Sequence, residues 1–398
     1  MLEETELLVV GCGPAGGVAA REAARAGVET LVLEKDAQIG VKRVCAAGLR
    51  PGFCTTFDLP KTIVHCDTPR LALFDIHGRE HEVFFGPGHT TTREELDGTI
   101  AQLARAEGAQ IRTGALLRSF ARDGDRVVVE YADLAAGLRR RVSARTVFFA
   151  QGATARLEDG SPFAYEGWRD GLMATLQYRV YPERPAAAIA YQTLELHYYR
   201  ARDGRMLIGW MFPKRDHLAV GLGVMGKMPG AQLRTELDAF EARVRARLYP
   251  QIPTRRKEEG HLLYGGMPRP AVAQAGALVG GTAAGLVDAT NGEGIFEAAA
   301  SGRLAAQTAA SAGLRSGEAA GRYASALQAR FSTRLRRRVR IMEFLCARPE
   351  RFGMLFESLA ASPPFAQALY REDRERTPAD RLALYAAAAR FALRALYA

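Results

Sequence analysis

The sequence contains no long apolar segment. No run of about 18 apolar residues lacks a charge, so we expect no helix that spans a membrane. Its first residues show no basic segment followed by an apolar one, so we expect no secretory leader and a cytoplasmic location. Only five cysteines occur among 398 residues, without a CxxC pair or zinc-ligand spacing to histidine. These absences exclude a disulfide scaffold and predict no metal site.

Acidic residues are fewer than basic ones, 44 against 54, which gives a formal net charge of +10. The late part of the chain carries a run of arginines, namely Arg330, Arg334, Arg336, Arg337, Arg338 and Arg340. Such a run could bind an acidic membrane surface, a diphosphate or nucleic acid, or form the solvated face of a helix. We expect that the protein does not bind nucleic acid and that it is a monomer or a weak dimer. The chain length favours two interlocked domains.

The most informative stretch lies near the start. A β-prone run, residues 6–10, leads into Gly11-Cys12-Gly13-Pro14-Ala15-Gly16 and then into an alanine-rich segment. This strand, Gly-x-Gly-x-x-Gly loop and helix are typical of a dinucleotide-binding βαβ unit, whose helix N-terminus faces a pyrophosphate. A second predicted strand, residues 29–33, ends at Glu34, and an acid at this distance suits a ribose hydroxyl pair.

The remaining pattern returns twice to this nucleotide-binding unit. Short strands are predicted at 70–76 and 80–85, a helix at 94–107, a hairpin at 116–131 and a buried strand at 141–150. Residues 173–224 are strand-rich, a helix covers 231–248, strands follow at 262–267 and 277–281, and the chain is helical from about 295. We therefore expect the second domain to consist of separate segments that are inserted into the nucleotide-binding domain.

A second glycine-rich stretch runs from Gly281 through Asp288 to Gly292-Glu293-Gly294-Ile295. A strand, a small-residue turn and a loop that opens a helix offer backbone N–H groups to an anion or an electron-rich ring edge. As a bare pattern it could equally be a packed turn between a strand and a helix.

These motifs occur in an order that resembles FAD-dependent enzymes of the hydroxybenzoate-hydroxylase-like fold. The motifs are Gly11 to Gly16, Arg93-Glu94-Glu95-Leu96-Asp97, Ala150-Gln151-Gly152 and Gly281 to Ile295. Within that fold, the Gly292 to Ile295 ending, the Cys45-x-x-Gly48-Leu49 loop and Trp210-Met211-Phe212-Pro213 resemble the geranylgeranyl reductase family. The resemblance covers roughly residues 5–345.

The resemblance implies an α/β protein with a discontinuous Rossmann-like FAD-binding domain. We assign residues 1–69, 90–155 and 265–330 to this domain, 70–89 and 156–264 to an interleaved antiparallel-sheet substrate domain, and 331–398 to a helical C-terminal region. FAD would lie across the interface, and NAD(P)H or another transient donor would reduce it. The implied cofactor-binding residues are Gly11, Gly13, Pro14, Ala15, Gly16, Glu34, Lys35, Cys45, Ala46, Arg93, Gly152, Thr282, Asp288, Gly292, Gly294 and Ile295.

Cys45 is the implied catalytic residue, because its loop lies beside the flavin in the family and a thiol could act there as a proton donor or redox partner. Without the motif, a free cysteine is usually a small buried apolar residue. Trp210, Phe212 and Gly48 are the implied substrate residues, and the two aromatic rings suit either a prenyl channel or a sheet core. The next two residues, Lys214 and Arg215, are expected to be solvated cations or a diphosphate site.

Three residues depart from the family pattern. Thr282 stands where an aspartate usually binds the flavin half of the cofactor, Gln151 replaces another aspartate, and Ile208 stands where relatives often carry tyrosine. We therefore keep three hypotheses: a reductase of isoprenoid carbon–carbon double bonds, a flavin monooxygenase of an aromatic or quinone-linked substrate, and a non-catalytic prenyl-lipid-binding protein with a weakened FAD site. Gly285, where hydroxylases of this fold usually carry histidine, and Glu293 favour the reductase.

Two further segments invite interpretation. Gly221 to Gly226 repeats the Gly-x-Gly-x-x-Gly pattern, but Pro229 interrupts the helix that should follow, so we interpret the segment as a turn. Near the C-terminus, Thr377 and Pro378 predict a helix start, after which Leu382 and Tyr385 recur on one face. That face is expected either to contact a membrane peripherally or to dock on the protein itself.

Overall fold

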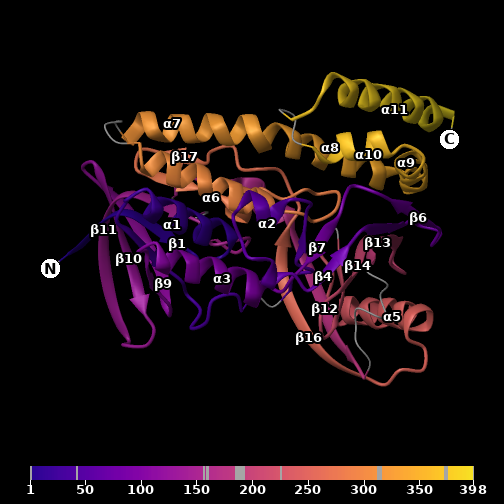
Figure 1. Ribbon diagram of the computed structural model, residues 1–398, viewed down its shortest axis with the longest axis horizontal. Coiled ribbons are helices and arrows are strands. Elements are labelled where there is room, and N and C mark those ends of the chain that lie inside the picture. Colours follow the sequence, from indigo (N-terminus) through magenta and orange to yellow (C-terminus); the bar gives the residue numbers. More distant parts are fainter. Residues whose placement is uncertain are drawn as a thin grey trace.

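The computed structural model describes residues 2–41, 44–155, 157, 161–183, 193–224, 226–311, 316–371 and 375–397. Two sheet-based regions lie side by side, and the helices of the last third of the chain run along one edge of both (Figure 1). The mixture of parallel and antiparallel sheets with a helical C-terminal region confirms the predicted α/β class.

The first region is built on an eight-stranded sheet. Strand β1 (Glu3–Val10) lies at its centre, parallel to β2 (Thr30–Leu33) and β11 (Leu138–Phe149). The sheet continues to β8 (Gln110–Arg112) beyond β2 and to β18 (Ala277–Val279) and β17 (Ala273–Gln274) beyond β11, while β9 (Ala115–Asp123) and β10 (Arg126–Asp133) branch from β11. Both faces of β1 are covered, which explains its continuous apolar run.

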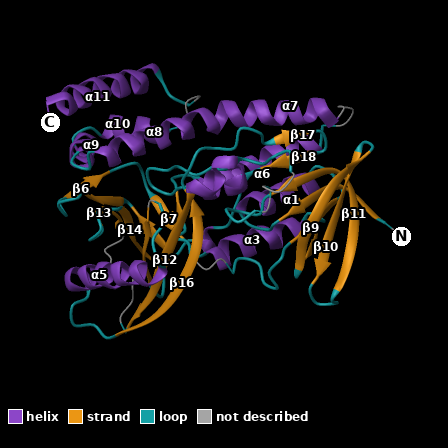
Figure 2. Cartoon of the chain, turned by 180° about the vertical axis from the view of Figure 1, so that it is seen from behind, coloured by secondary structure: helices purple, strands orange, loops and turns teal. Residues whose placement is uncertain are grey.

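Three helices pack on this sheet: α1 (Pro14–Arg25), α3 (Arg93–Ala106) and α6 (Ile295–Ala309). Helices α1 and α6 approach closely, since a Cβ atom at Gly302 would lie 2.1 Å from the backbone oxygen of Ala15. This close approach brings together segments that are almost 300 residues apart in the sequence, and α6 lies between α1 and the long helices of the C-terminal region (Figure 2).

The second region is a seven-stranded sheet. Its order is β16 (Thr254–Tyr264), β12 (Leu172–Pro182), β15 (Leu218–Val224), β14 (Met206–Pro213), β13 (Thr193–Arg200), β5 (Arg70–Phe74) and β6 (Glu80–Val83). Helix α5 (Gly230–Leu248) covers one face with Leu233, Leu237 and Phe240. Strand β5 therefore pairs with β13, which lies more than 100 residues later in the sequence, and β6 pairs with β5 at the edge of the sheet.

A small three-stranded sheet joins the two regions. It consists of β3 (Gly48–Leu49), β7 (Gly88–Thr90) and β4 (Cys66–Thr68), and helix α2 (Phe53–Thr56) and a 3-10 turn (Lys61–Ile63) lie between β3 and β4. Strands of two or three residues are too short to show an alternation of apolar and polar residues, so the sequence pattern does not predict this sheet. It fixes the loop that carries Cys45.

The C-terminal helices are α7 (Ser316–Leu327), α8 (Thr333–Ala347), α9 (Arg351–Ala360), α10 (Pro363–Tyr370) and α11 (Pro378–Tyr397), with a π-helical turn at Gln328–Ser332. The predicted cap is confirmed, because the Thr377 hydroxyl accepts a hydrogen bond from Asp380 N at 3.2 Å. Among the described helices, none is both long and apolar enough to cross a bilayer.

Two predicted segments differ in the structure. The strand predicted at 262–267 begins earlier, at Thr254, because β16 is an edge strand whose first half is charged and largely exposed. Gly221 is not in a turn but within β15, where a Cβ atom would lie 2.4 Å from the Trp210 indole. The glycine therefore makes room for the tryptophan; Met225 of the same motif lies outside the described residues.

Candidate active site

A cavity of about 1020 Å³ lies where the two regions meet. It extends without interruption from the glycine loop after β1 to the apolar side chains of the seven-stranded sheet. Every site residue predicted from the sequence lines this cavity except Gly16. The structure therefore brings together residues from both regions and from positions as far apart as Val10 and Ala298.

The first glycine loop is shaped by close backbone contacts. Gly11 has a φ of +99°, and a Cβ atom there would lie 2.6 Å from the carbonyl oxygen of Ala150. A Cβ atom at Gly16 would lie only 1.8 Å from the Gly11 carbonyl oxygen, so Gly16 serves packing and does not face the cavity. No side chain caps the N-terminus of α1 among the described residues, so its first N–H groups face the cavity.

Glu34 is held in place beside this loop. Its carboxylate accepts hydrogen bonds from the backbone N–H groups of Cys12, at 2.7 Å, and Asp36, at 3.0 Å. The adjacent Lys35 is exposed and pairs with Asp36 at 3.1 Å. The orientation of Glu34 is therefore set by the backbone, as recognition of a ribose requires.

The second glycine-rich stretch lines the opposite end of the cavity, where α6 begins without a side-chain cap among the described residues. Gly152 and Gly292 have positive φ values and open space where a Cβ atom would be. Nearby, the Oε1 atom of Gln151 is buried and has no hydrogen-bond partner among the described residues. Two uncapped helix N-termini, bare glycine backbone and an unsatisfied acceptor fit a cofactor with a pyrophosphate and a polar ring edge.

Asp288 lies in the same stretch, but its carboxylate is engaged by protein groups. Arg338 of α8 contacts it at 3.2 Å, and Thr290 donates to it from both its backbone N–H and its hydroxyl. Thr282 lines the cavity within a 3-10 turn and presents a neutral hydroxyl.

Cys45 is half-buried and lines the cavity. Arg93 of α3 lies beside it, forms an ion pair with Asp97 at 2.5 Å, and packs so closely that a Cβ atom at Gly13 would be 3.2 Å from its Nη2 atom. Burial lowers the pKa of Arg93, but the side chains of Asp97 and Cys45 outweigh burial and raise it above the ordinary value. Arg93 is therefore a buried cation between the glycine loop and Cys45, not an exposed residue of the helix start.

The apolar part of the cavity is formed by the seven-stranded sheet. Trp210 is fixed by a hydrogen bond from its Nε1 atom to Gln177 at 2.9 Å, and the Phe212 ring lies against Gly48. Further apolar lining residues are Leu71, Val83, Phe85, Leu194, Leu196 and Ile208. These walls suit a long apolar ligand.

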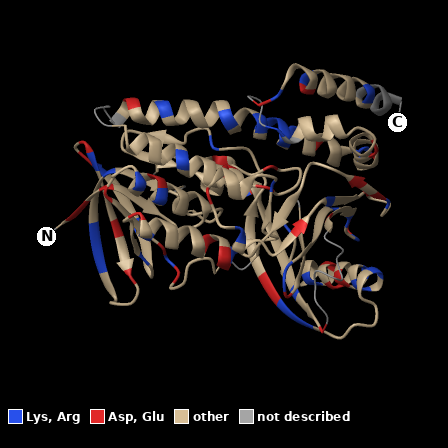
Figure 3. Cartoon of the chain, viewed as in Figure 1, with Lys and Arg blue, Asp and Glu red and all other residues tan. Residues whose placement is uncertain are grey.

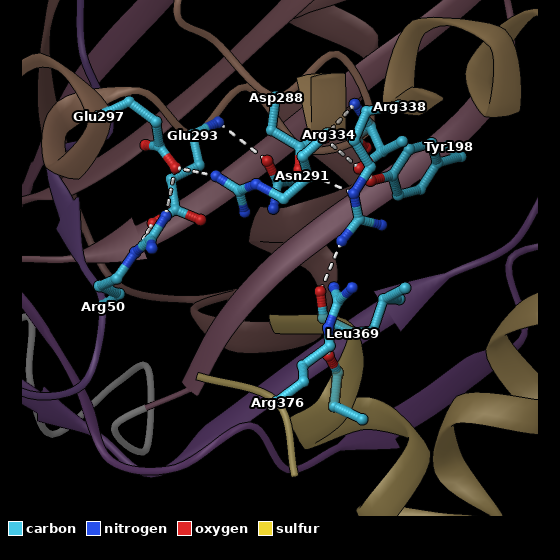
Figure 4. Close-up of polar contacts among 12 residues, drawn as sticks. Arg50, Tyr198, Asp288, Asn291, Glu293, Glu297, Arg334, Arg338, Leu369 and Arg376 are labelled. Atoms are coloured by element: carbon cyan, nitrogen blue, oxygen red, sulfur yellow. Dashed lines mark hydrogen bonds and ion pairs between the residues drawn. The ribbon is translucent and has the colours of Figure 1, made fainter. Parts of the chain in front are cut away.

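One buried ion-pair network was not predicted from the sequence. Arg50, directly after β3, contacts Glu293 and Glu297 at 2.6 Å each, and Glu297 also pairs with Arg334 at 2.6 Å (Figure 4). Burial raises the pKa of Glu293, although Arg50 opposes the shift. The network holds the glycine-rich loop between β3 and α8, so part of the arginine run is structural.

The rest of that arginine run is more open to solvent. Arg337 and Arg340 are exposed on α8, where basic residues cluster near the start of the helix (Figure 3). Lys214 was also misjudged: it is buried, whereas its neighbour Arg215 is exposed. The sequence gives no sign of this difference, because burial of Lys214 depends on the distant Cys45 loop.

Comparisons with known proteins identify the family of this chain. A sequence family described as an NAD(P)-binding Rossmann-like domain matches residues 9–75. The chain is 28% identical to geranylgeranyl diphosphate reductase of Rhodobacter capsulatus, across 79% of this chain and 77% of the relative. It is 31% identical to digeranylgeranylglycerophospholipid reductase 1 of Methanopyrus kandleri, across 78% and 81%. A geranylgeranyl bacteriochlorophyll reductase-like structure from Thermoplasma acidophilum has a TM-score of 0.78 at 21% identity, across 91% and 93%.

The fold and the cavity thus define an FAD-dependent oxidoreductase built on a Rossmann-like domain. The sequence identity and coverage place it further: the chain belongs to the geranylgeranyl reductase family. The resemblance inferred from the motifs is therefore confirmed.

Proposed function

We propose that this protein reduces carbon–carbon double bonds of an isoprenoid chain. The observation that carries the proposal is the single cavity in which the glycine loop, the half-buried Cys45 and the apolar wall of Trp210 and Phe212 meet. The relatives named above are reductases of geranylgeranyl-type molecules, which supports the same substrate class.

The residues at the two ends of the cavity have different roles in the proposed reaction. We assign Gly11 to Ala15, Glu34 and Arg93 to the adenosine and pyrophosphate part of FAD, and Gly292 to Ile295 to the flavin part. When bound and reduced, FAD supplies a hydride. Reduction of a double bond also needs a proton, and we assign its delivery to the Sγ atom of Cys45, which regains the proton from solvent. NAD(P)H or another donor docks transiently to supply electrons.

Gly285 favours this reaction over hydroxylation. Its φ is +75°, and a Cβ atom there would lie 2.9 Å from the Cα atom of Pro268. A histidine, which hydroxylases of the fold usually carry at this place, would be strained and crowded.

The decisive experiment is anaerobic turnover. The FAD-loaded protein is reduced chemically, mixed without oxygen with geranylgeranyl diphosphate or an unsaturated archaeal-type phospholipid, and the products are analysed by mass spectrometry. We expect products that have gained one hydrogen molecule per reduced bond. Turnover that requires oxygen and yields a hydroxylated product would establish the monooxygenase, and a protein that stays colourless with added FAD would leave the lipid-binding alternative.

We also propose peripheral contact with the inner face of the cytoplasmic membrane. Leu382 and Tyr385 of α11 are 70% and 75% exposed, and Ile341 and Phe344 of α8 are partly exposed. The side chains of Leu393 and Leu396, further along the same helix, lie outside the described residues. Sedimentation with anionic vesicles tests this: L382S/Y385S should bind less than wild type, and equal binding would contradict it.

A further inference from the structure

Lys214 is a buried lysine that the proposed reaction leaves without a role. It follows β14 directly, and only 1% of its surface is exposed. Its Nζ atom donates hydrogen bonds to the carbonyl oxygens of Ala46 and Ala47, the latter at 3.4 Å. The residue directly after the strand that carries Trp210 and Phe212 thus holds the loop that carries Cys45.

That loop contains a strained residue at the point where Lys214 contacts it. Ala47 has a φ of +47°, in the left-handed region that residues with a Cβ atom rarely adopt. Such a conformation persists only when the surroundings fix it. The Ala47 carbonyl also accepts a hydrogen bond from Thr91 N at 3.0 Å, so two separate elements hold this peptide.

The same strand end makes two further contacts with the loop and its sheet. A Cβ atom at Gly48 would lie 2.7 Å from the Phe212 ring, and the Thr90 hydroxyl donates to the Pro213 carbonyl at 2.6 Å. Because Gly48 pairs with Thr90 in the small sheet, the loop is attached to β14 on both sides of the strained residue.

We propose that Lys214 is a positioning residue: its Nζ atom, by donating hydrogen bonds to the Ala46 and Ala47 carbonyls, clamps the left-handed Ala47 peptide and thereby fixes Cys45 against the cofactor-binding cavity. The clamp also couples the substrate wall to Cys45, since displacement of β14 moves the lysine that holds the loop. Lys214 touches neither substrate nor cofactor, because it does not line the cavity.

Lys214 can fill this role in either protonation state, because both the ammonium group and the neutral amine carry N–H donors. Burial lowers its pKa to about 7. The titratable and charged groups that influence it are Cys45, Cys66, Arg179, Glu94, His65 and His217. No carboxylate pairs directly with the ammonium group among the described residues, so the two loop carbonyls are its hydrogen-bond acceptors.

The test measures the accessibility of Cys45 in the full-length protein. Wild type and K214M, which keeps the apolar stem but has no donor, are treated with iodoacetamide, and alkylation of each cysteine is followed by peptide mass spectrometry. Cys346, the other half-buried cysteine, is an internal reference because it lies on α8. We expect the ratio of Cys45 to Cys346 alkylation to rise about tenfold as the strained loop relaxes.

Two controls make the result specific. R215M removes the neighbouring exposed cation, whose guanidinium contacts Thr62 and Val64 and not the loop carbonyls, and should leave the ratio unchanged. In K214M/A47G, glycine adopts a positive φ without strain, so the ratio should return to within about threefold of wild type. K214Q, too short to reach both carbonyls, gives the same test with an intermediate ratio if K214M does not fold.

An unchanged ratio in folded K214M, an equal rise at Cys346, or the absence of rescue by A47G would overturn the proposal. The role assigned to Cys45 rests on the proposed function, but the alkylation ratio does not. Failure of anaerobic reduction with a normal K214M response would remove the function and leave the clamp, and the reverse result would remove the clamp alone.

Discussion

Glu297 of α6 and Arg334 of α8 form a buried ion pair of 2.6 Å, in which the Glu297 side chain has no exposed surface. The same carboxylate oxygen pairs with Arg50, so one atom links β3, the helix that opens at the cavity, and the C-terminal helices. Sequence positions 50, 297 and 334 are thereby held in one cluster.

Substitution E297Q should destabilise the protein strongly. Loss of the shared carboxylate leaves the buried Arg334 without its ionic partner and leaves Arg50 with Glu293 alone, so the free energy of unfolding should fall by about 3–5 kcal/mol. Denaturant unfolding measures this. E318Q is the matched control, because Glu318 forms an exposed pair with Arg322, and its effect should stay within about 1 kcal/mol. Equal effects of the two substitutions would contradict the structural role of the network.

Substitution C45A should strongly lower the rate of double-bond reduction and leave FAD binding unchanged. If the thiol donates the proton, turnover under anaerobic conditions should fall by about 10²-fold or more, which is the usual contribution of general acid catalysis. The visible spectrum of bound FAD should persist. C346A should retain wild-type turnover, and a C45A enzyme as fast as C346A would remove Cys45 from the reaction.

Substitution T282D should strengthen FAD binding. A carboxylate makes a charge-assisted hydrogen bond to a hydroxyl of the cofactor, whereas Thr282 offers a neutral one, so the dissociation constant should fall about tenfold. Titration followed by flavin fluorescence gives this constant. T282S keeps the hydroxyl and should match wild type; weaker binding by T282D would show that Thr282 does not face the flavin half.

Stability should depend on pH through Lys214. The folded protein releases this proton near pH 7, whereas the unfolded chain keeps it up to the ordinary value of 10.5. Unfolding therefore takes up a proton between these values, and the free energy of unfolding of wild type should rise with pH relative to K214M, by at most about 1.4 kcal/mol per pH unit. Urea unfolding at pH 7, 8 and 9 measures the slope, and R215M should run parallel to wild type. Parallel curves for wild type and K214M would show that Lys214 does not titrate there.

Substitution G221A should impair substrate binding alone. The new methyl group would meet the Trp210 indole at 2.4 Å and push it toward the cavity. The KM for the isoprenoid should rise about tenfold, in line with the cost of overpacking, while FAD affinity stays unchanged. G230A is the control, because open space surrounds Gly230. Loss of FAD from G221A would point to a wider disturbance.

The two glycine-rich motifs predicted much of the fold because their requirements are local. The turn at Gly11 and the helix starts at Pro14 and Ile295 follow from backbone geometry, which neighbouring residues largely determine. The position of Glu34 follows similarly from the length of one βαβ unit.

Other features depend on contacts between distant segments and leave no local pattern. Lys214 and Arg215 look alike in the sequence, and only the Cys45 loop makes one buried and the other exposed. Arg334 and Arg338 likewise differ from Arg337 only because Glu297 and Asp288 face them from elsewhere. The Gly221 motif was misinterpreted because the space beside Gly221 is filled by a tryptophan on the adjacent strand, which the local pattern does not reveal.

The neighbouring positions of β11 and β18 affect how the protein is made. These strands pair directly, yet the ribosome synthesises most of the seven-stranded sheet between them. The nascent chain can form the adenosine end of the site early, but the last residues of β11, from Val147 to Phe149, keep an open edge until β18 emerges. The flavin end is complete only after α6 has followed. The newly made protein therefore acquires its capacity to hold the whole cofactor late, when about three quarters of the chain has left the ribosome.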